Sequence, residues 1–262
     1  MAKFFPMFSS SKGNSTYIGD STGGLLVDAG VSFKRINEKL TSRSIPLSNI
    51  KAVLITHEHS DHINGLRTLL KKTGALLIAS RETIYALEFH KVIDDSVKRV
   101  YIDDFEEYTL DSFVIKRFAT SHDCVGSSGY TVTLSDGRRV AVCTDLGIVT
   151  DEVREGLCGS DLVMLESNHD PVMLRLGPYP PELKIRVAGE KGHLSNAVSS
   201  ELIGQLYKTG TRRFILAHLS ENNNTPEKAE SAARAALVSA GAKANDYILY
   251  VAEPDGIKVM SI

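Results

Sequence analysis

The chain has 262 residues, of which 24% are charged and 42% belong to the hydrophobic set. These fractions are close to the averages of soluble globular proteins, so they exclude a disordered chain, a collagen-like repeat and a coiled coil. Thirty Lys and Arg residues against 32 Asp and Glu residues give a net charge of -2. This balance argues against a uniformly basic surface made for nucleic acid, although it leaves room for a local basic patch.

The three cysteines are an odd number without framework spacing, so no disulfide scaffold is expected and a reducing, cytoplasmic setting fits best. The apolar stretch near the N-terminus is too short and too interrupted by proline to be the core of a signal peptide. No apolar run approaches the roughly 20 residues that cross a bilayer, so we expect a soluble protein without a membrane partner.

Short β-like segments separated by Ser, Gly and Asn turns open the chain, and helices then alternate with apolar strands. The expected strands are 4–8, 16–18, 24–27, 52–55, 75–78, 114–118, 129–134, 139–143, 162–165 and 213–217. The expected helices are 31–40, 61–73, 81–90, one that begins after Ser195 and one that begins after Thr225. No repeat or linker is visible, so we predict a single domain over 1–262. Strand groups flanked by helices predict an α+β protein in which a pair of sheets is covered by helices.

The strongest chemical signal is Thr-His-Glu-His-Ser-Asp-His at 56–62, directly after the apolar strand 52–55. It places four side chains that can bind a metal within six residues: His57, His59, Asp61 and His62. Imidazole nitrogen and carboxylate oxygen together suit ions of borderline softness, and the segment is long enough to serve two neighbouring ions. The alternative is a polar helix entry that carries histidines by coincidence, which is uncommon for three histidines and an aspartate at this spacing.

His-x-His-x-Asp-His after a buried strand resembles the metallo-β-lactamase superfamily, whose fold is a four-layer αβ/βα sandwich. The resemblance implies further site residues at the ends of apolar strands, namely Asp28, His122, Asp145 and His218. Asp28 would orient the metal loop from behind the ligands, although a helix cap before Val31 is the competing interpretation. The resemblance assigns His57, His59 and His122 to one ion, Asp61, His62 and His218 to a second, and Asp145 to both.

Two divalent ions about 3.5 to 4 Å apart can hold a hydroxide between them, lower its pKa and polarise the bond to be cut. The same ligands accept Zn or Mn, with Fe as a further option. Secreted β-lactam hydrolases of the superfamily typically carry Cys where this chain has Asp145. Asp at this position is instead similar to the nuclease, phosphodiesterase and glyoxalase II branches.

Three features favour a phosphodiester substrate. The loop 9–15 offers Ser11, Lys12 and Asn14 as a phosphate cradle, although turns of this composition are common. Gly-His-Leu-Ser-Asn at 192–196 resembles the His-Ser-Thr loop of tRNA 3′-processing nucleases, which implies a proton-donating role for His193 and substrate contact for Ser195. A surface histidine before a helix is the alternative. The third feature is a small basic cluster, which a solvated helix face would also explain: Arg175, Lys184, Arg186 and Lys191.

Over nearly its full length the chain resembles the YycJ/WalJ group of bacterial metallo-hydrolases, on these motifs together with Glu-Ser-Asn-His-Asp at 166–170 and Ala-His-Leu-Ser-Glu at 217–221. The group implies a cytosolic DNA exonuclease that works in the 5′ to 3′ direction with a metal-bridging hydroxide, Asp61 and His193 being the residues assigned to catalysis. The segments between the ligands leave no space for a tRNA-clamping arm or an inserted domain. The alternative is a small-molecule hydrolase that cleaves a thioester, a lactone or a cyclic phosphodiester.

Overall fold

Two mixed β-sheets pack against each other in the computed structural model, which describes residues 2–257 and 260–262. The first sheet is antiparallel at one edge and parallel from its middle strand onward. Its seven strands, from edge to edge, are β14 (Met260–Ser261), β1 (Lys3–Ser10), β2 (Gly13–Gly19), β3 (Gly24–Val27), β4 (Ile50–Leu54), β5 (Leu76–Ala79) and β6 (Arg99–Tyr101).

The second sheet repeats this plan, with antiparallel pairing on one side and parallel pairing on the other. Its seven strands are β13 (Ile248–Val251), β12 (Arg213–Ala217), β11 (Leu162–Glu166), β10 (Arg139–Cys143), β9 (Ser128–Thr133), β8 (Phe113–Ala119) and β7 (Tyr108–Leu110). Parallel strands point their carboxyl ends to one edge, so the loops that follow them gather there.

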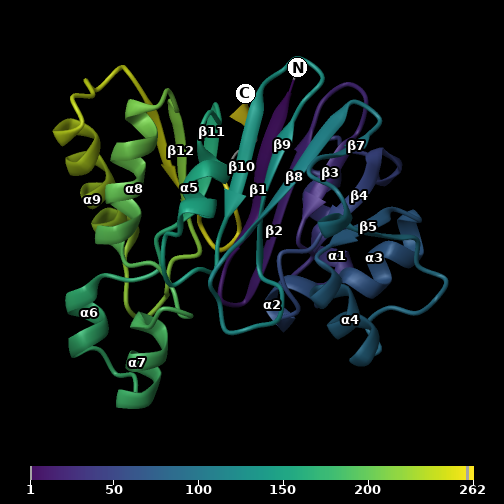
Figure 1. Ribbon diagram of the computed structural model, residues 1–262, viewed down its shortest axis with the longest axis horizontal. Helices are drawn as coiled ribbons and strands as arrows, with labels where there is room; N and C mark the ends of the chain where they lie inside the picture. Colours follow the sequence, from purple (N-terminus) through teal and green to yellow (C-terminus); the bar gives the residue numbers. More distant parts are fainter. Residues whose placement is uncertain (1, 258–259) are drawn as a thin grey trace.

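Helices cover the outer face of each sheet (Figure 1). On the first sheet lie α1 (Phe33–Thr41), α3 (Leu66–Thr73) and α4 (Arg81–Phe89), and on the second lie α5 (Asp151–Leu157), α8 (Asn196–Lys208) and α9 (Pro226–Ser239). One apolar cluster fills the space between the sheets. A second cluster joins the first sheet to its helices, and a third joins the second sheet to its helices. The predicted α+β sandwich of four layers is thus confirmed.

The region predicted as one helix over 61–73 forms two, α2 (Ser60–Ile63) and α3. Gly65 separates them because its N–H donates to the Ala29 carbonyl oxygen at 2.8 Å and not to the carbonyl four residues earlier. A Cβ at this position would lie 2.2 Å from the Val31 carbonyl oxygen, so only glycine permits this close approach. The break lets α2 turn toward the centre of the molecule while α3 packs on the sheet.

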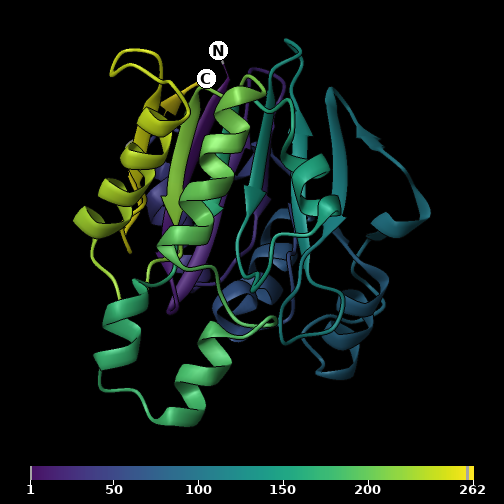
Figure 2. The ribbon, with the colours of Figure 1, turned by 60° about the vertical axis from the view of Figure 1, so that its left-hand side comes forward.

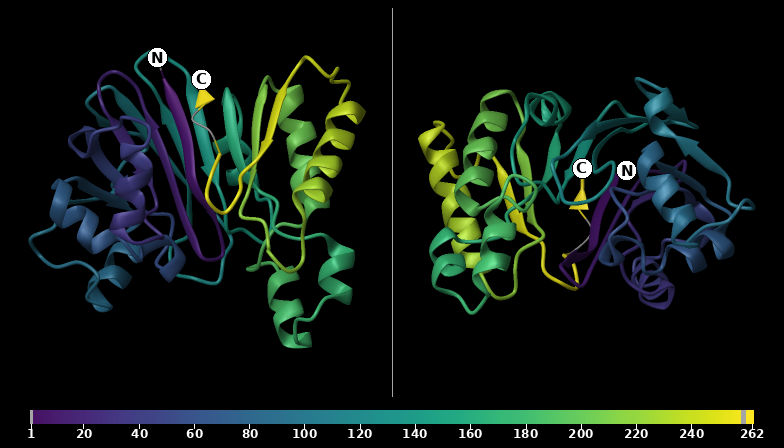
Figure 3. Two further views of the ribbon diagram at one scale, coloured as in Figure 1. Left: turned by 180° about the vertical axis from the view of Figure 1, so that it is seen from behind. Right: turned by 60° about the horizontal axis from the view of Figure 1, so that its bottom comes forward.

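The caps predicted for the last two helices are confirmed. Ser195 Oγ accepts from the Val198 N–H at the start of α8, and Thr225 precedes Pro226 at the first position of α9. Between β11 and α8 lie two short helices that the sequence pattern does not predict, α6 (Pro171–Leu176) and α7 (Pro181–Ala188). They extend beyond the sheets at the end where α2 lies (Figures 2 and 3). In the described residues no helix has the length and apolar character to cross a membrane.

Candidate metal centre

The backbone at three strand ends aims polar side chains at a common point. Asp28 follows β3, Asp145 follows β10 and His218 follows β12, and all three have positive φ angles of 63°, 59° and 55°. This conformation costs a non-glycine residue about 1 to 3 kcal/mol, so the surrounding contacts must enforce it. Each N–H is accordingly held: that of Asp28 by the Leu54 carbonyl at 2.8 Å, and that of His218 by Ser9 Oγ at 2.9 Å. Strain of this kind, gathered at one place, is typical of a functional site.

The first of two groups of candidate ligands joins His57 and His59 to His122. The ring centroid of His57 lies 4.6 Å from that of His59 and 5.0 Å from that of His122. Nδ1 of His122 donates to the Gly192 carbonyl oxygen at 3.2 Å, which leaves Nε2 as the unprotonated nitrogen. Nε2 of His57 is buried and has no hydrogen-bond partner among the described residues. These nitrogens can therefore accept a cation.

The second group brings Asp61 and His62 of α2 beside His218. Nε2 of His62 lies 3.5 Å from Asp61 Oδ2 and 3.4 Å from Asp145 Oδ2. Asp145 also reaches the first group, because its Oδ1 is 3.9 Å from His122 Nε2. Its carboxylate thus stands between the two groups, in the position that the sequence predicts for a shared ligand.

The electrostatics of the cluster favour bound positive charge. Burial raises the pKa of Asp145, but the surrounding histidines lower it by a larger amount. The net pKa is therefore well below its usual value. Burial lowers the pKa of His218, but Asp145 and other carboxylates raise it to about 10. His57, by contrast, has a pKa well below its usual value, because burial and His62 oppose its protonation. Two buried atoms, His218 Nε2 and Asp145 Oδ2, have no hydrogen-bond partner among the described residues. Together with the ionised aspartates and the neutral histidine, they fit a divalent metal ion.

Asp28 lies behind the metal loop and not in it. Its Oδ2 accepts from His62 Nδ1 at 2.7 Å, and its Oδ1 accepts from the Thr56 N–H at 2.9 Å. Thr56 Oγ1 completes this buried network by donating to Asp28 Oδ2 at 2.9 Å. Asp28 holds a proton on Nδ1 of His62. The other ring nitrogen, Nε2, therefore faces Asp61 and Asp145.

Glu166, the last residue of β11, is fully buried. It begins the sequence motif at 166–170, and the motif alone assigns it no role. Its Oε1 accepts from Nδ1 of His218 at 2.8 Å and from Nδ1 of His193 at 2.9 Å. Its Oε2 accepts from the Leu194 N–H at 2.9 Å. Burial raises the pKa of Glu166, but His193 and the hydrogen bonds lower it to about 2. A carboxylate at the end of an otherwise apolar strand is the signal that could have identified it.

The predicted substrate residues have different surroundings. Asn14 is buried and its Nδ2 donates to His62 Nε2 at 3.0 Å, on the lone pair that an ion would use. Ser11 and Lys12 are exposed in the turn between β1 and β2, and Lys12 Nζ pairs with Glu221 at 2.6 Å. Ser195 Oγ is engaged as the cap of α8.

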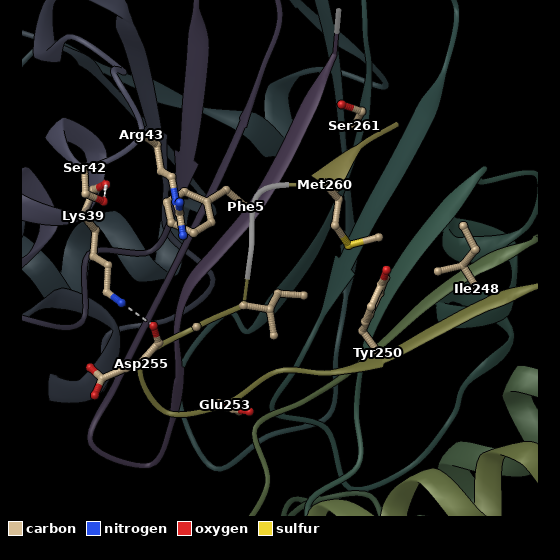
Figure 4. Close-up of a pocket in the computed structure, with 12 residues that line it drawn as sticks. Phe5, Lys39, Ser42, Arg43, Ile248, Tyr250, Glu253, Asp255, Met260 and Ser261 are labelled. Carbon is tan, nitrogen blue, oxygen red and sulfur yellow. Dashed lines mark hydrogen bonds between the residues drawn. The ribbon is translucent and has the colours of Figure 1, made fainter.

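A separate cavity of about 670 Å³ lies away from the histidines, between α1 and the edge strand β13. Phe5, Lys39, Arg43, Tyr250 and Met260 are among the residues that line it (Figure 4). None of its lining residues belongs to the histidine and aspartate groups. The reactive groups therefore define the candidate site, and this cavity does not.

Comparison with known proteins agrees with this geometry. Residues 24–219 match the family described as the beta-lactamase superfamily domain. The chain is 35% identical over 257 residues to the exodeoxyribonuclease WalJ of Streptococcus pneumoniae serotype 2, covering 97% of this chain and 95% of the relative. It is 32% identical over 239 residues to the exodeoxyribonuclease YycJ of Bacillus anthracis, covering 91% and 90%. The chain therefore belongs to the metallo-β-lactamase-fold family and, within it, groups with the WalJ and YycJ proteins.

Among solved structures, the Zn²⁺-bound PqqB of Methylobacterium extorquens has a TM-score of 0.71 over all of both chains, at 20% identity. This likeness shows the shared fold. The family and the fold predicted from the sequence motifs are thus both confirmed.

Proposed function

We propose that this protein is a metal-dependent exodeoxyribonuclease that degrades DNA from the 5′ end. The observation that carries the proposal is the convergence of six histidines and aspartates from distant parts of the chain around Asp145, with His193 beside them. The exodeoxyribonuclease relatives, which match over more than nine-tenths of the chain, support the reaction class. A DNA substrate also favours the cytoplasm as the compartment, and we propose a single catalytic domain over 1–262.

We propose two divalent ions, Zn or Mn, as the cofactors. His57, His59 and His122 would hold one ion, Asp61, His62 and His218 the other, and Asp145 both. When bound, such ions supply an activated water and neutralise charge on the phosphate. Asp28 keeps His62 in the required tautomer, and Glu166 does the same for His218.

His193 is proposed as the proton donor to the leaving oxygen. Nδ1 is anchored on Glu166, so Nε2 is the free nitrogen, and the side chain is 19% exposed. Burial lowers the pKa of His193, but Glu166 raises it, and the net pKa lies above its usual value. This direction favours the protonated imidazole, and an alkoxide leaving group requires a proton. Ser11, Lys12, Asn14 and Ser195 are proposed to position the strand.

The test is digestion of DNA and RNA strands that carry a label at the 5′ end or the 3′ end, with Zn or Mn added. We expect release of labelled mononucleotide from the 5′-labelled DNA strand at early times, and loss of this product in Asp61→Ala. His193→Asn should slow the cleavage of DNA about 100-fold or more, whereas Asn245→Ala, at an exposed position outside the proposed site, should leave it unchanged. Hydrolysis of a thioester or a lactone by the wild type, with every nucleic acid left intact, would refute the proposal.

A further inference from the structure

A cationic groove begins at the metal loop and continues along α3. Two adjoining cavities, of about 380 and 480 Å³, form it and share Arg67 and Val92. The first is lined by Glu58 and Ser60, which alternate with the candidate ligands in sequence, and by Lys91. The second continues to Lys71 and Lys98.

The four cations of this groove are exposed, and two carboxylates, Glu58 and Asp94, line the same cavities, which leaves a local charge of +2. Among the described residues, no carboxylate lies within 4.0 Å of the charged group of Arg67, Lys71, Lys91 or Lys98. Two other basic side chains near the site differ, since Lys12 pairs with Glu221 and Arg186 pairs with Asp123. Charge that is not neutralised within the protein is available to an anionic ligand.

The position of Arg67 argues for a role beyond stabilising its own helix. Lys71 lies in the last turn of α3, where the negative end of the helix dipole accounts for a cation. Arg67 lies in the first turn of the same helix, where that dipole disfavours one. Arg67 and Lys71 are four residues apart, so their side chains share one face of α3, about 5 to 6 Å apart at their Cβ atoms.

An exposed aromatic side chain stands close in sequence to Lys91. Phe89, the last residue of α4, is 81% exposed and stands two residues before Lys91. Tyr85, one turn earlier on the helix, is 51% exposed. Cations combined with exposed aromatic rings are the features that bind single-stranded nucleic acid, because cations hold the phosphates and rings stack on bases.

We propose that this groove, which we call the α3 groove, binds a single-stranded segment of the nucleic acid whose end is in the metal centre. The inference rests on the proposed nuclease function and adds the path of the strand outside the site. Arg67 and Lys91 contact the phosphates nearest the metal loop, and Lys71 and Lys98 contact those farther along. Phe89 stacks on a base.

Binding is measured by fluorescence anisotropy with a phosphorothioate single-stranded DNA, at several salt concentrations, on the metal-loaded protein. We expect the double variant Arg67→Gln/Lys91→Gln to bind about tenfold more weakly and to reduce the salt slope by about 1.4, since two phosphate contacts are lost. The matched control, Lys208→Gln/Lys243→Gln, removes the same charge from exposed positions at the end of α8 and in the loop after α9. It should bind as the wild type does.

Kinetics separate the groove from the chemistry. The Arg67→Gln/Lys91→Gln variant should raise KM for a long single strand and leave the hydrolysis of bis(p-nitrophenyl) phosphate unchanged, because that small ester does not reach the groove. Equal binding by this variant and the control, or a loss confined to blunt duplex DNA, would overturn the groove proposal. A wild type that binds the strand through these residues but cleaves no nucleic acid would refute the proposed function alone.

Discussion

Replacing Glu166 with glutamine tests whether one buried carboxylate organises the centre. The carboxylate accepts from five donors, three at Oε1 and two at Oε2. A glutamine amide presents its NH₂ group at one of these positions, so whichever way it turns, at least two donors face another donor. An unsatisfied buried donor costs about 1 to 3 kcal/mol, which makes the expected loss about 2 to 6 kcal/mol. That is a large part of the roughly 5 to 15 kcal/mol that typically holds a domain folded.

The assay is denaturant unfolding, together with titration of Zn against a chelator of known affinity. Because His193 and His218 lose the acceptor that fixes their tautomers, metal affinity should fall about 10- to 100-fold. Glu190→Gln is the matched control, since Glu190 is exposed and close in sequence to His193. If Glu166→Gln proves too unstable to purify, Glu166→Asp keeps the charge and shortens its reach, and metal affinity should still fall. Wild-type stability and wild-type metal affinity in Glu166→Gln would show that this carboxylate does not organise the centre.

Three further predictions concern the fold and the metal. Gly65→Ala places a Cβ 2.2 Å from the Val31 carbonyl oxygen and should destabilise the protein by about 1 to 3 kcal/mol. Gly204→Ala is the control and should be tolerated, because the nearest atom to its Cβ is 3.4 Å away. Equal melting temperatures of the two variants would contradict this prediction. Burial raises the pKa of Asp20, but hydrogen bonds such as that from Ser135 lower it below its usual value of 3.8. The ionised Asp20 therefore stabilises the folded protein above that pH, and this contribution is lost as the pH falls. Asp20→Asn should therefore lower the free energy of unfolding by about 1 kcal/mol at neutral pH, and the difference should shrink in acid. A chelator should lower the melting temperature of the wild type, and added Zn or Mn should restore it, an effect absent if no ion binds.

The sequence predicts which histidines and aspartates come together better than it predicts the details of the fold. Histidines and aspartates at the ends of apolar strands were visible as a pattern, because parallel strands end at one edge whatever their exact bounds. The break at Gly65 was missed because it depends on a contact with the Ala29 carbonyl, far away in sequence. The carboxylate of Glu166 at the end of an apolar strand signals a special role, but its partners His193 and His218 lie 27 and 52 residues away, and no local pattern identifies them.

Helices α6 and α7 were missed for a related reason. Both are short, and α7 buries none of its side chains, so neither shows the apolar periodicity that marks a packed helix. They form where a proline at the start of each helix fixes the backbone, and Asp170 caps the first of them. These local signals account for the two helices without an apolar face.

We propose above that this cluster of histidines and aspartates holds two divalent ions through a shared Asp145. The most direct measurement is the metal content of the purified protein by mass spectrometry, after loading with Zn and dialysis, for the wild type, Asp145→Ala and the control Asp161→Ala. We predict about two ions per chain for the wild type and the control, as in two-metal hydrolase sites, and fewer than one for Asp145→Ala. A wild type that keeps no ion, or an Asp145→Ala variant that keeps as many as the wild type, would contradict the account.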